Sequence, residues 1–127
     1  NIDGVIPIDG AAYDVARQMQ DGGNFMADTY NQAFGSDPAR QRTLSPTLHA
    51  ASPNAPAFLI IHVQRKDGTA QSIGLQAALR KGGTKADRQE FEGRGLKGHA
   101  EINRSLGDPA YAATPVVDAW LNRIFGS

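Results

Sequence analysis

Two side chains of the types that cooperate in acid–base catalysis occur at Asp67 and His99. A histidine can take and return a proton near neutral pH, and a carboxylate bonded to its ring fixes the tautomer and stabilises the imidazolium. The two residues are 32 positions apart (99 − 67). Only the fold can bring them together, so the elements before each of them decide whether they can act as a pair. Asp67-Gly68 also has the composition of an ordinary turn.

Three segments have the pattern of extended chain: residues 4–8, 57–63 and 87–92. The first two are continuous apolar runs, typical of strands buried on both faces of a parallel sheet. The third is more polar and is predicted as an edge strand. Reactive groups in open parallel sheets gather beyond the carboxyl ends of the strands. Asp67 and His99 follow the second and third segments, so we expect them to form a hydrogen-bonded pair at one edge of the sheet.

Helical patterns occur between and after these strands. Residues 69–81 place apolar side chains on one face and stop at Gly82-Gly83. Thr114-Pro115 supplies an N-cap and a first-turn proline for a helix with a wide apolar stripe that ends at Gly126. Residues 13–43 contain shorter helical pieces, and residues 93–103 are predicted as a loop. This order is typical of an α/β fold, but two or three strands are few, so we expect the sheet to continue outside this chain.

Four runs of sequence resemble α/β-hydrolase esterases and lipases, in the order that the family has them. They are Gly4–Asp14, which resembles the segment after the nucleophile region; Ser45–His49; Phe58–His62 with Asp67 and Ala70-Gln71-Ser72 beyond it; and Gly98-His99 followed by Glu101-Ile102-Asn103 and Leu106-Gly107-Asp108. The resemblance covers essentially the whole chain. It implies that residues 1–127 are the C-terminal part of a single α/β-hydrolase domain, a mostly parallel sheet flanked by helices, with residues 13–56 as a helical insertion beside the substrate pocket.

The same resemblance implies a serine hydrolase of carboxylic esters in which Asp67 is the triad acid and His99 the general base. No cofactor is implied. The family's G-x-S-x-G nucleophile elbow and its His-Gly-Gly oxyanion loop are both absent. None of the serines has glycine at both −2 and +2; they are Ser36, Ser45, Ser52, Ser72, Ser105 and Ser127. The expected partner is therefore an N-terminal portion of the same polypeptide that carries the nucleophile and the oxyanion hole.

The start of the chain supports that expectation. Asn1 leads directly into an apolar segment, with no initiator methionine and no signal-peptide pattern. We interpret this as a cut in a longer polypeptide, which would make the protein a proteolytically processed, two-chain enzyme. Two alternatives stay open: a fragment of a prolyl-oligopeptidase-type serine peptidase, and a non-catalytic binding domain of the same fold. A homo-oligomer also stays open.

A second departure from the family concerns the segment before Asp67. Residues 63–66 read Val-Gln-Arg-Lys where the family often has Gly-Asp-x-Asp. Asp67 is then the one acid at this point of the chain. The triad hypothesis therefore depends on its carboxylate facing His99.

The remaining motifs give weaker indications of function. His49 and His62 are interpreted as structural. Residues 93–98 match G-x-G-x-x-G, but a polar preceding strand and the lack of a later ribose-binding acid disfavour a dinucleotide site. The three histidines have no metal-ligand spacing. Apolar side chains of the inserted region could line an acyl or alcohol pocket or simply pack in a core; they are Met19, Phe25, Met26, Tyr30 and Phe34.

Composition excludes several classes of protein. Lys+Arg and Asp+Glu are both 13, so the net charge is zero. A protein that binds nucleic-acid phosphates needs a basic face, and this balance disfavours one. The chain has no cysteine, which excludes disulfides, thiolate metal sites and a cysteine nucleophile. No apolar run approaches the roughly 20 residues of a membrane-spanning helix. The compartment is not indicated.

Overall fold

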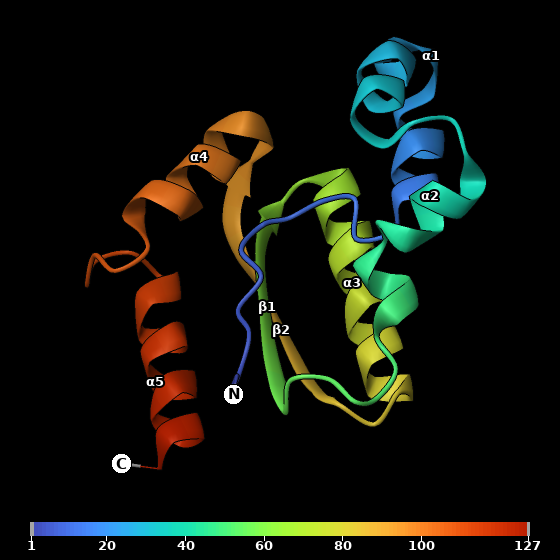
Figure 1. Cartoon of the computed structure of the whole chain (residues 1–127). Coiled ribbons are helices and arrows are strands. Elements are labelled where there is room, and N and C mark those ends of the chain that lie inside the picture. Colours follow the sequence, from blue (N-terminus) through green and yellow to red (C-terminus); the bar gives the residue numbers. More distant parts are fainter. Residues whose placement is uncertain (1, 127) are drawn as a thin grey trace.

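Helices and strands alternate along the second half of the chain, while the first half is mainly helical (Figure 1). The computed structural model describes residues 2–126. Its elements are α1 (Val15–Phe34), α2 (Pro38–Thr43), the short 3₁₀ helix η1 (Pro46–His49), β1 (Ala57–Gln64), α3 (Lys66–Lys81), β2 (Lys85–Arg94), α4 (Gly95–Ser105) and α5 (Ala113–Phe125). The fold is therefore α/β with a small parallel sheet.

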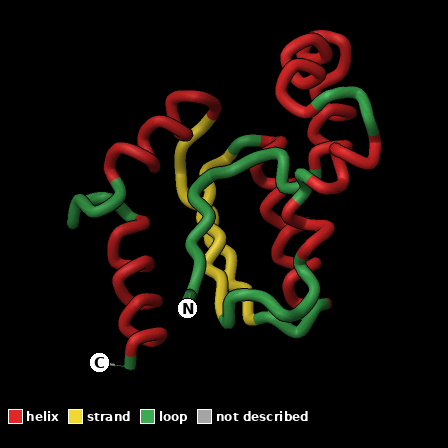
Figure 2. The backbone as a smooth tube through the Cα atoms, viewed as in Figure 1, coloured by secondary structure: helices red, strands yellow, loops and turns green. Residues whose placement is uncertain are grey.

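The sheet is parallel, as the sequence predicts. β1 pairs with β2 in a register that places Ala57 beside Lys85, and the N-terminal segment runs parallel along the other side of β1 (Figure 2). That segment makes four backbone hydrogen bonds to β1 but only two isolated bridges, at Val5 and Ile8. Pro7 accepts a bond from Ile61 but has no N–H to donate. The predicted first strand is therefore interrupted at Pro7.

The apolar run of β1 is buried on both faces because successive side chains point to opposite sides of a strand. The odd-numbered residues, such as Leu59 and Ile61, join a core with α4 and α5 that includes Trp120. Ile60 joins Leu75 and Leu79 of α3 in a second core on the opposite face. The helices accordingly cover the sheet from both sides, with α3 on one side and α4 and α5 on the other (Figure 1).

Two helix predictions need correction, and both concern the candidate pair. α3 begins at Lys66 rather than at residue 69, so Asp67 lies in its first turn instead of in a loop. Residues 93–103 are predicted as a loop, but most of them belong to α4, which spans Gly95–Ser105. α4 lacks the apolar stripe from which a helix is usually predicted. Its buried residues are Gly98 and Ile102, which lie four positions apart on one face.

The remaining helices follow the pattern more closely. The expected break between α1 and α2 occurs at Gly35, which has a φ of 76°. The other expected break is a kink within α1 at Gly23, where φ is 56°. α5 begins one residue before the predicted N-cap, and Thr114 Oγ1 instead accepts a hydrogen bond from Gly107 N–H.

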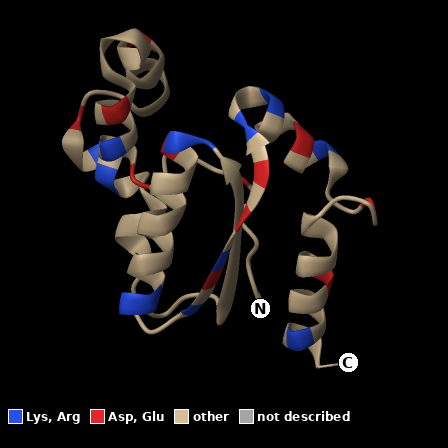
Figure 3. Ribbon diagram, turned by 180° about the vertical axis from the view of Figure 1, so that it is seen from behind, with Lys and Arg blue, Asp and Glu red and all other residues tan. Residues whose placement is uncertain are grey.

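Charged residues of both signs are interspersed over the elements, and β2 carries both (Figure 3). This mixture of signs is consistent with the zero net charge. None of the helices within residues 2–126 has the length and apolarity that crossing a membrane requires.

Candidate active site

His99 is hydrogen-bonded to a buried carboxylate. Its Nδ1 atom lies 2.7 Å from Oδ2 of Asp9, a residue 90 positions earlier in the chain. The Asp9 side chain is fully buried, whereas the His99 side chain is 41% exposed. A short contact between an imidazole N–H and a carboxylate is a charge-assisted hydrogen bond, about twice as strong as a neutral one. This contact places the ring proton on Nδ1.

Asp9 is held by three donors. Its Oδ1 accepts from Val63 N–H at 3.0 Å, and its Oδ2 accepts from Arg65 Nε at 2.9 Å as well as from His99. Arg65 also donates through a terminal nitrogen to the Asp9 carbonyl at 2.8 Å. These bonds satisfy a carboxylate that would otherwise be costly to bury. The Asp9 backbone has a φ of 46°, a left-handed conformation that Asp tolerates better than most residues.

The fold brings Asp9 and His99 together at the carboxyl ends of parallel extended segments. Asp9 directly follows the bridge residue Ile8, and its N–H bonds the carbonyl of Ile61 on β1 at 2.7 Å. His99 lies on the second turn of α4, which starts immediately after β2. A side chain at Gly98 would place its Cβ 2.7 Å from the carbonyl carbon of Gly93. The small residue therefore lets α4 sit close enough to the sheet for His99 to reach Asp9.

The second ring nitrogen of His99 is available for chemistry. Within residues 2–126, no side chain or backbone group hydrogen-bonds Nε2. With the proton on Nδ1, Nε2 carries a lone pair on a partly exposed edge of the ring. Such a nitrogen can accept a proton from a nucleophile and return it to a leaving group.

Asp67 faces other partners, so the predicted pair of Asp67 with His99 is not formed. Its Oδ2 accepts from the Gln18 side chain at 3.1 Å, and its Oδ1 accepts from Gly68 N–H at 2.8 Å. An Arg65 terminal nitrogen lies 3.9 Å away. The physical reason is the early start of α3: in the first turn, a carboxylate interacts favourably with the N–H groups and dipole of its own helix. A catalytic role for Asp67 itself stays a prediction.

These partners change the acidity of Asp67. Burial by itself would raise the pKa of its carboxyl group, but hydrogen bonds from Gln18 and Gly68, together with the Arg65 charge, lower that pKa below its ordinary value. Asp67 is thus a carboxylate at neutral pH, and it belongs to a hydrogen-bonded set in which Gln18 also donates to the Tyr30 hydroxyl at 3.0 Å.

The other two histidines have backbone partners that fit structural roles. His62 is fully buried; its Nδ1 donates to the Val63 carbonyl at 3.0 Å, and its Nε2 accepts from Arg88 at 2.9 Å. His49 Nε2 is 3.1 Å from the carbonyls of Arg42 and Thr43.

The glycines of residues 93–98 also have a structural explanation. Gly93 has a φ of 139° and packs against Gly98, so the motif lets the end of β2 pass close to α4.

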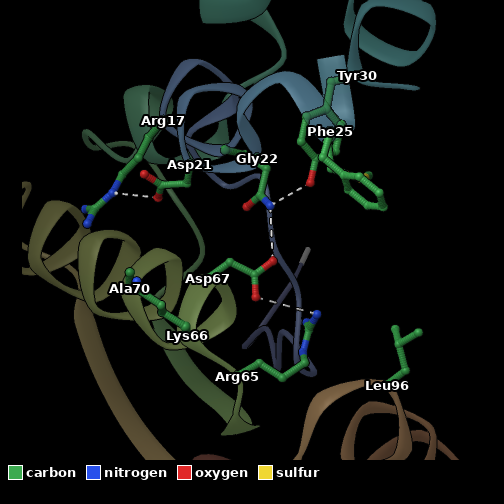
Figure 4. A pocket seen from close by; sticks show the side chains of 12 residues that line it. Arg17, Asp21, Gly22, Phe25, Tyr30, Arg65, Lys66, Asp67, Ala70 and Leu96 are labelled. Carbon is green, nitrogen blue, oxygen red and sulfur yellow. Dashed lines mark hydrogen bonds and ion pairs between the residues drawn. The ribbon is translucent and has the colours of Figure 1, made fainter. Parts of the chain in front are cut away.

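A cavity of about 650 Å³ is lined by residues of α1, of α4 and of the start of α3 (Figure 4), and neither Asp9 nor His99 is among its lining residues. Its wall includes Arg65, which contacts Asp9, and Leu96, which lies three positions before His99 on α4. Of the five predicted pocket residues, it includes Phe25, Met26 and Tyr30; Met19 and Phe34 do not line it. Phe25 is 96% exposed and Leu96 82% exposed. A volume of this size suits a small organic ligand.

Tyr111 is a further polar group close to the pair. Burial raises the pKa of its hydroxyl, and the negative charges of Glu101 and Asp9 raise it further. Within the described residues the hydroxyl oxygen is buried without a hydrogen-bond partner.

Asp9 and Arg65 are the site residues that sequence reasoning missed. A signal for Asp9 was present, because it is the first acid after the apolar segment 4–8, and the strand-end rule applies to that segment as it does to the other two. Arg65 carried no comparable signal.

The part of the chain that the structure describes contains no cluster of three His, Asp or Glu side chains that could hold a metal ion. Comparisons with protein-family models, with curated proteins and with solved structures find no match for this chain.

Proposed function

We propose that this chain supplies the histidine and the acid of a serine-type hydrolase of carboxylic esters. The observation that carries the proposal is the 2.7 Å hydrogen bond between His99 and the buried Asp9 at the carboxyl ends of the parallel segments. His99 Nε2 takes the proton of the attacking hydroxyl and returns it to the departing alcohol. Asp9 keeps the ring in the tautomer that leaves Nε2 unprotonated, and it stabilises the imidazolium that forms in between.

The nucleophile comes from a segment outside this chain. The serines within residues 2–126 make no hydrogen bond to His99, and Ser45 Oγ is held by Val15 N–H and the Gln41 carbonyl. The partner is an N-terminal portion of the same polypeptide. An open sheet edge supports this: Ile6 and Ile8 turn their main-chain groups away from β1, and those groups make no backbone hydrogen bond within residues 2–126. A further parallel strand at that edge would end on the same side as Asp9 and His99.

The substrate is an ester with an apolar acyl or alcohol group. The cavity shares Arg65 with the Asp9–His99 pair and exposes Phe25 and Leu96. Large apolar side chains that stay exposed at a pocket favour binding of an apolar ligand. The polar set of Gln18, Tyr30 and Asp67 lines the same cavity. These groups can orient the polar part of the ligand.

The proposal is tested by treating the native preparation with a fluorophosphonate and recording an intact mass spectrum under denaturing conditions. A labelled second chain, with this chain unmodified, is the expected result. His99→Gln should abolish both labelling and ester turnover, because the attacking hydroxyl then has no base. His49→Gln is the matched control and should change neither, since the His49 ring hydrogen-bonds the carbonyls of Arg42 and Thr43 and does not line the cavity.

Two results would overturn the proposal. Turnover of a chromogenic ester that persists in His99→Gln removes the mechanism. A sample in which this chain is the sole species and takes no label supports a non-catalytic binding domain. Cleavage of prolyl peptides in preference to esters would instead identify a peptidase that uses the same pair.

A further inference from the structure

Arg65 holds the residue that orients His99. It follows β1 directly and precedes α3, and its side chain is only 14% exposed. Its Nε atom donates to Asp9 Oδ2 at 2.9 Å, and a terminal nitrogen donates to the Asp9 carbonyl at 2.8 Å. One guanidinium thus hydrogen-bonds both the side chain and the backbone of Asp9. The planar fork of arginine suits such a two-point contact, which a lysine ammonium could not reproduce.

The two contacts constrain the backbone conformation of Asp9 and the orientation of its carboxylate. The bond to the carbonyl holds a backbone with a φ of 46°. The bond to Oδ2 fixes the carboxylate plane at the oxygen that also accepts from His99 Nδ1. Without Arg65, the Asp9 carboxylate would keep only two hydrogen-bond donors, the Val63 N–H and His99 Nδ1. The carboxylate could then rotate away from the ring.

A glycine packs closely against this guanidinium. A Cβ at Gly68 would lie 3.3 Å from a terminal nitrogen of Arg65 and 3.6 Å from its Cζ. Gly68 is buried in the first turn of α3, and the Thr69 N–H bonds the Arg65 carbonyl at 2.7 Å. The start of α3 therefore packs around the arginine. The position of its side chain is set by the fold as well as by the ion pair.

We propose that Arg65 is a positioning residue: by holding Asp9, it keeps the His99 proton on Nδ1 and the Nε2 lone pair free. Its importance for turnover rests on the proposed function above. The effect of Arg65 on the tautomer of the imidazole ring does not rest on that function, because Asp9 orients the ring whether or not an ester is hydrolysed. The two consequences can therefore be measured separately.

The first measurement is ¹⁵N NMR of histidine-labelled protein, expressed from its complete coding sequence, at a pH where the ring is neutral. Two-bond correlations distinguish a protonated from an unprotonated ring nitrogen, and His99→Gln identifies the His99 signals. Wild-type protein should show His99 protonated at Nδ1. Arg65→Gln should show a mixture of both tautomers. Arg65→Lys keeps the charge but loses the two-point contact, so it should shift the ring signals in the same direction.

Arg88→Gln is the matched control, because Arg88 donates to the buried His62. It should alter the His62 signals and leave those of His99 unchanged. If His99 keeps the wild-type tautomer in both Arg65 variants, the inference is wrong. It is equally wrong if Arg88→Gln disturbs His99 as much as Arg65→Gln does, because the effect would then be a general loss of structure.

The second measurement is ester hydrolysis. Arg65→Gln should lower kcat about tenfold or more, because supporting residues that orient a reactive group act on the chemical step. Arg65 also lines the cavity, so a rise in KM with an unchanged kcat would assign it to substrate binding instead of positioning. A wild-type enzyme without ester turnover would remove the proposed function while the NMR result still decides the role of Arg65. An unchanged kcat in a variant with a mixed tautomer would show that Arg65 does not support catalysis.

Discussion

His99 Nδ1 lies 2.7 Å from Oδ2 of Asp9, although 90 positions separate the two residues. This carboxylate is fully buried, and it accepts further bonds from Val63 N–H and Arg65 Nε. Asp67, the acid that the resemblance implies for the triad, bonds Gln18 and Gly68 instead. The orientation of the ring therefore depends on a residue of the N-terminal segment.

Removing the Asp9 charge should destabilise the fold. Asp9→Asn replaces an acceptor oxygen by an NH₂ group and removes the closer of the two carboxylates paired with the mostly buried Arg65, the other being Asp67 at 3.9 Å. A broken buried ion pair costs about 3–5 kcal/mol in free energy of unfolding. Urea denaturation followed by circular dichroism measures this cost. Asp67→Asn is the control and should cost less than about 1 kcal/mol, because Asp67 is 37% exposed. Equal costs for the two variants would contradict the buried network around Asp9.

Stability in acid should depend on Asp67. The partners of Asp67 lower its pKa in the folded protein, so its contribution is fully present above its unfolded pKa of about 3.9. That contribution is lost as the pH falls through the lower folded pKa. The free energy of unfolding should therefore decline less steeply below about pH 4 in Asp67→Asn than in the wild type. Denaturation series between pH 5 and pH 2, at a matched salt concentration, measure the slope; identical slopes would contradict the prediction.

Gly98 should be essential for the placement of α4. Gly98→Ala puts a Cβ 2.7 Å from the Gly93 carbonyl carbon, so α4 must move away from β2. Overpacking of this kind costs about 1–3 kcal/mol, and the shift should also weaken the contact between His99 and Asp9. Gly74→Ala is the control: a Cβ at this position within α3 would have no neighbouring atom within 4 Å, and it should stabilise the fold by about 0.5–1 kcal/mol. Thermal unfolding of both variants should give shifts of opposite sign.

The Tyr111 hydroxyl should be dispensable for stability. Within residues 2–126 its oxygen is buried without a partner, and an unsatisfied polar group of this kind costs about 1–3 kcal/mol. Tyr111→Phe should therefore raise the free energy of unfolding by about 1 kcal/mol or leave it unchanged. Urea denaturation measures the change. A loss of stability would show that the hydroxyl has a bonding partner in solution.

The sheet could be predicted from the sequence because burial on both faces leaves a clear pattern. The apolar run that became β1 has partners on two sides, and its side chains alternate between two cores, so residues 57–61 are all apolar. The polar β2 was predicted from Phe91 and its neighbours, and it pairs with β1 as expected. Local sequence patterns were enough to predict these strands, because each strand can be identified from its own residues.

The pairing of His99 could not be predicted from such local patterns. Which carboxylate reaches the ring depends on the start of α3 and on the presence of α4, and both were placed wrongly. α4 buries only Gly98 and Ile102, so it lacks the apolar stripe by which helices are predicted. Asp9 was within the recognised segment Gly4–Asp14, but its role depends on a left-handed backbone and on contacts across more than 50 positions.

The most direct test of the account compares ester hydrolysis by Asp9→Asn and Asp67→Asn enzymes, each shown by circular dichroism to be folded under the assay conditions. If Asp9 orients His99, Asp9→Asn should lower kcat about a thousandfold or more, because its amide no longer selects the required tautomer. Asp67→Asn should lower kcat by about tenfold at most, because Asp67 lines the cavity but makes no hydrogen bond to His99. The opposite result, a large loss in Asp67→Asn and near-normal turnover in Asp9→Asn, would contradict the account and assign the acid to Asp67.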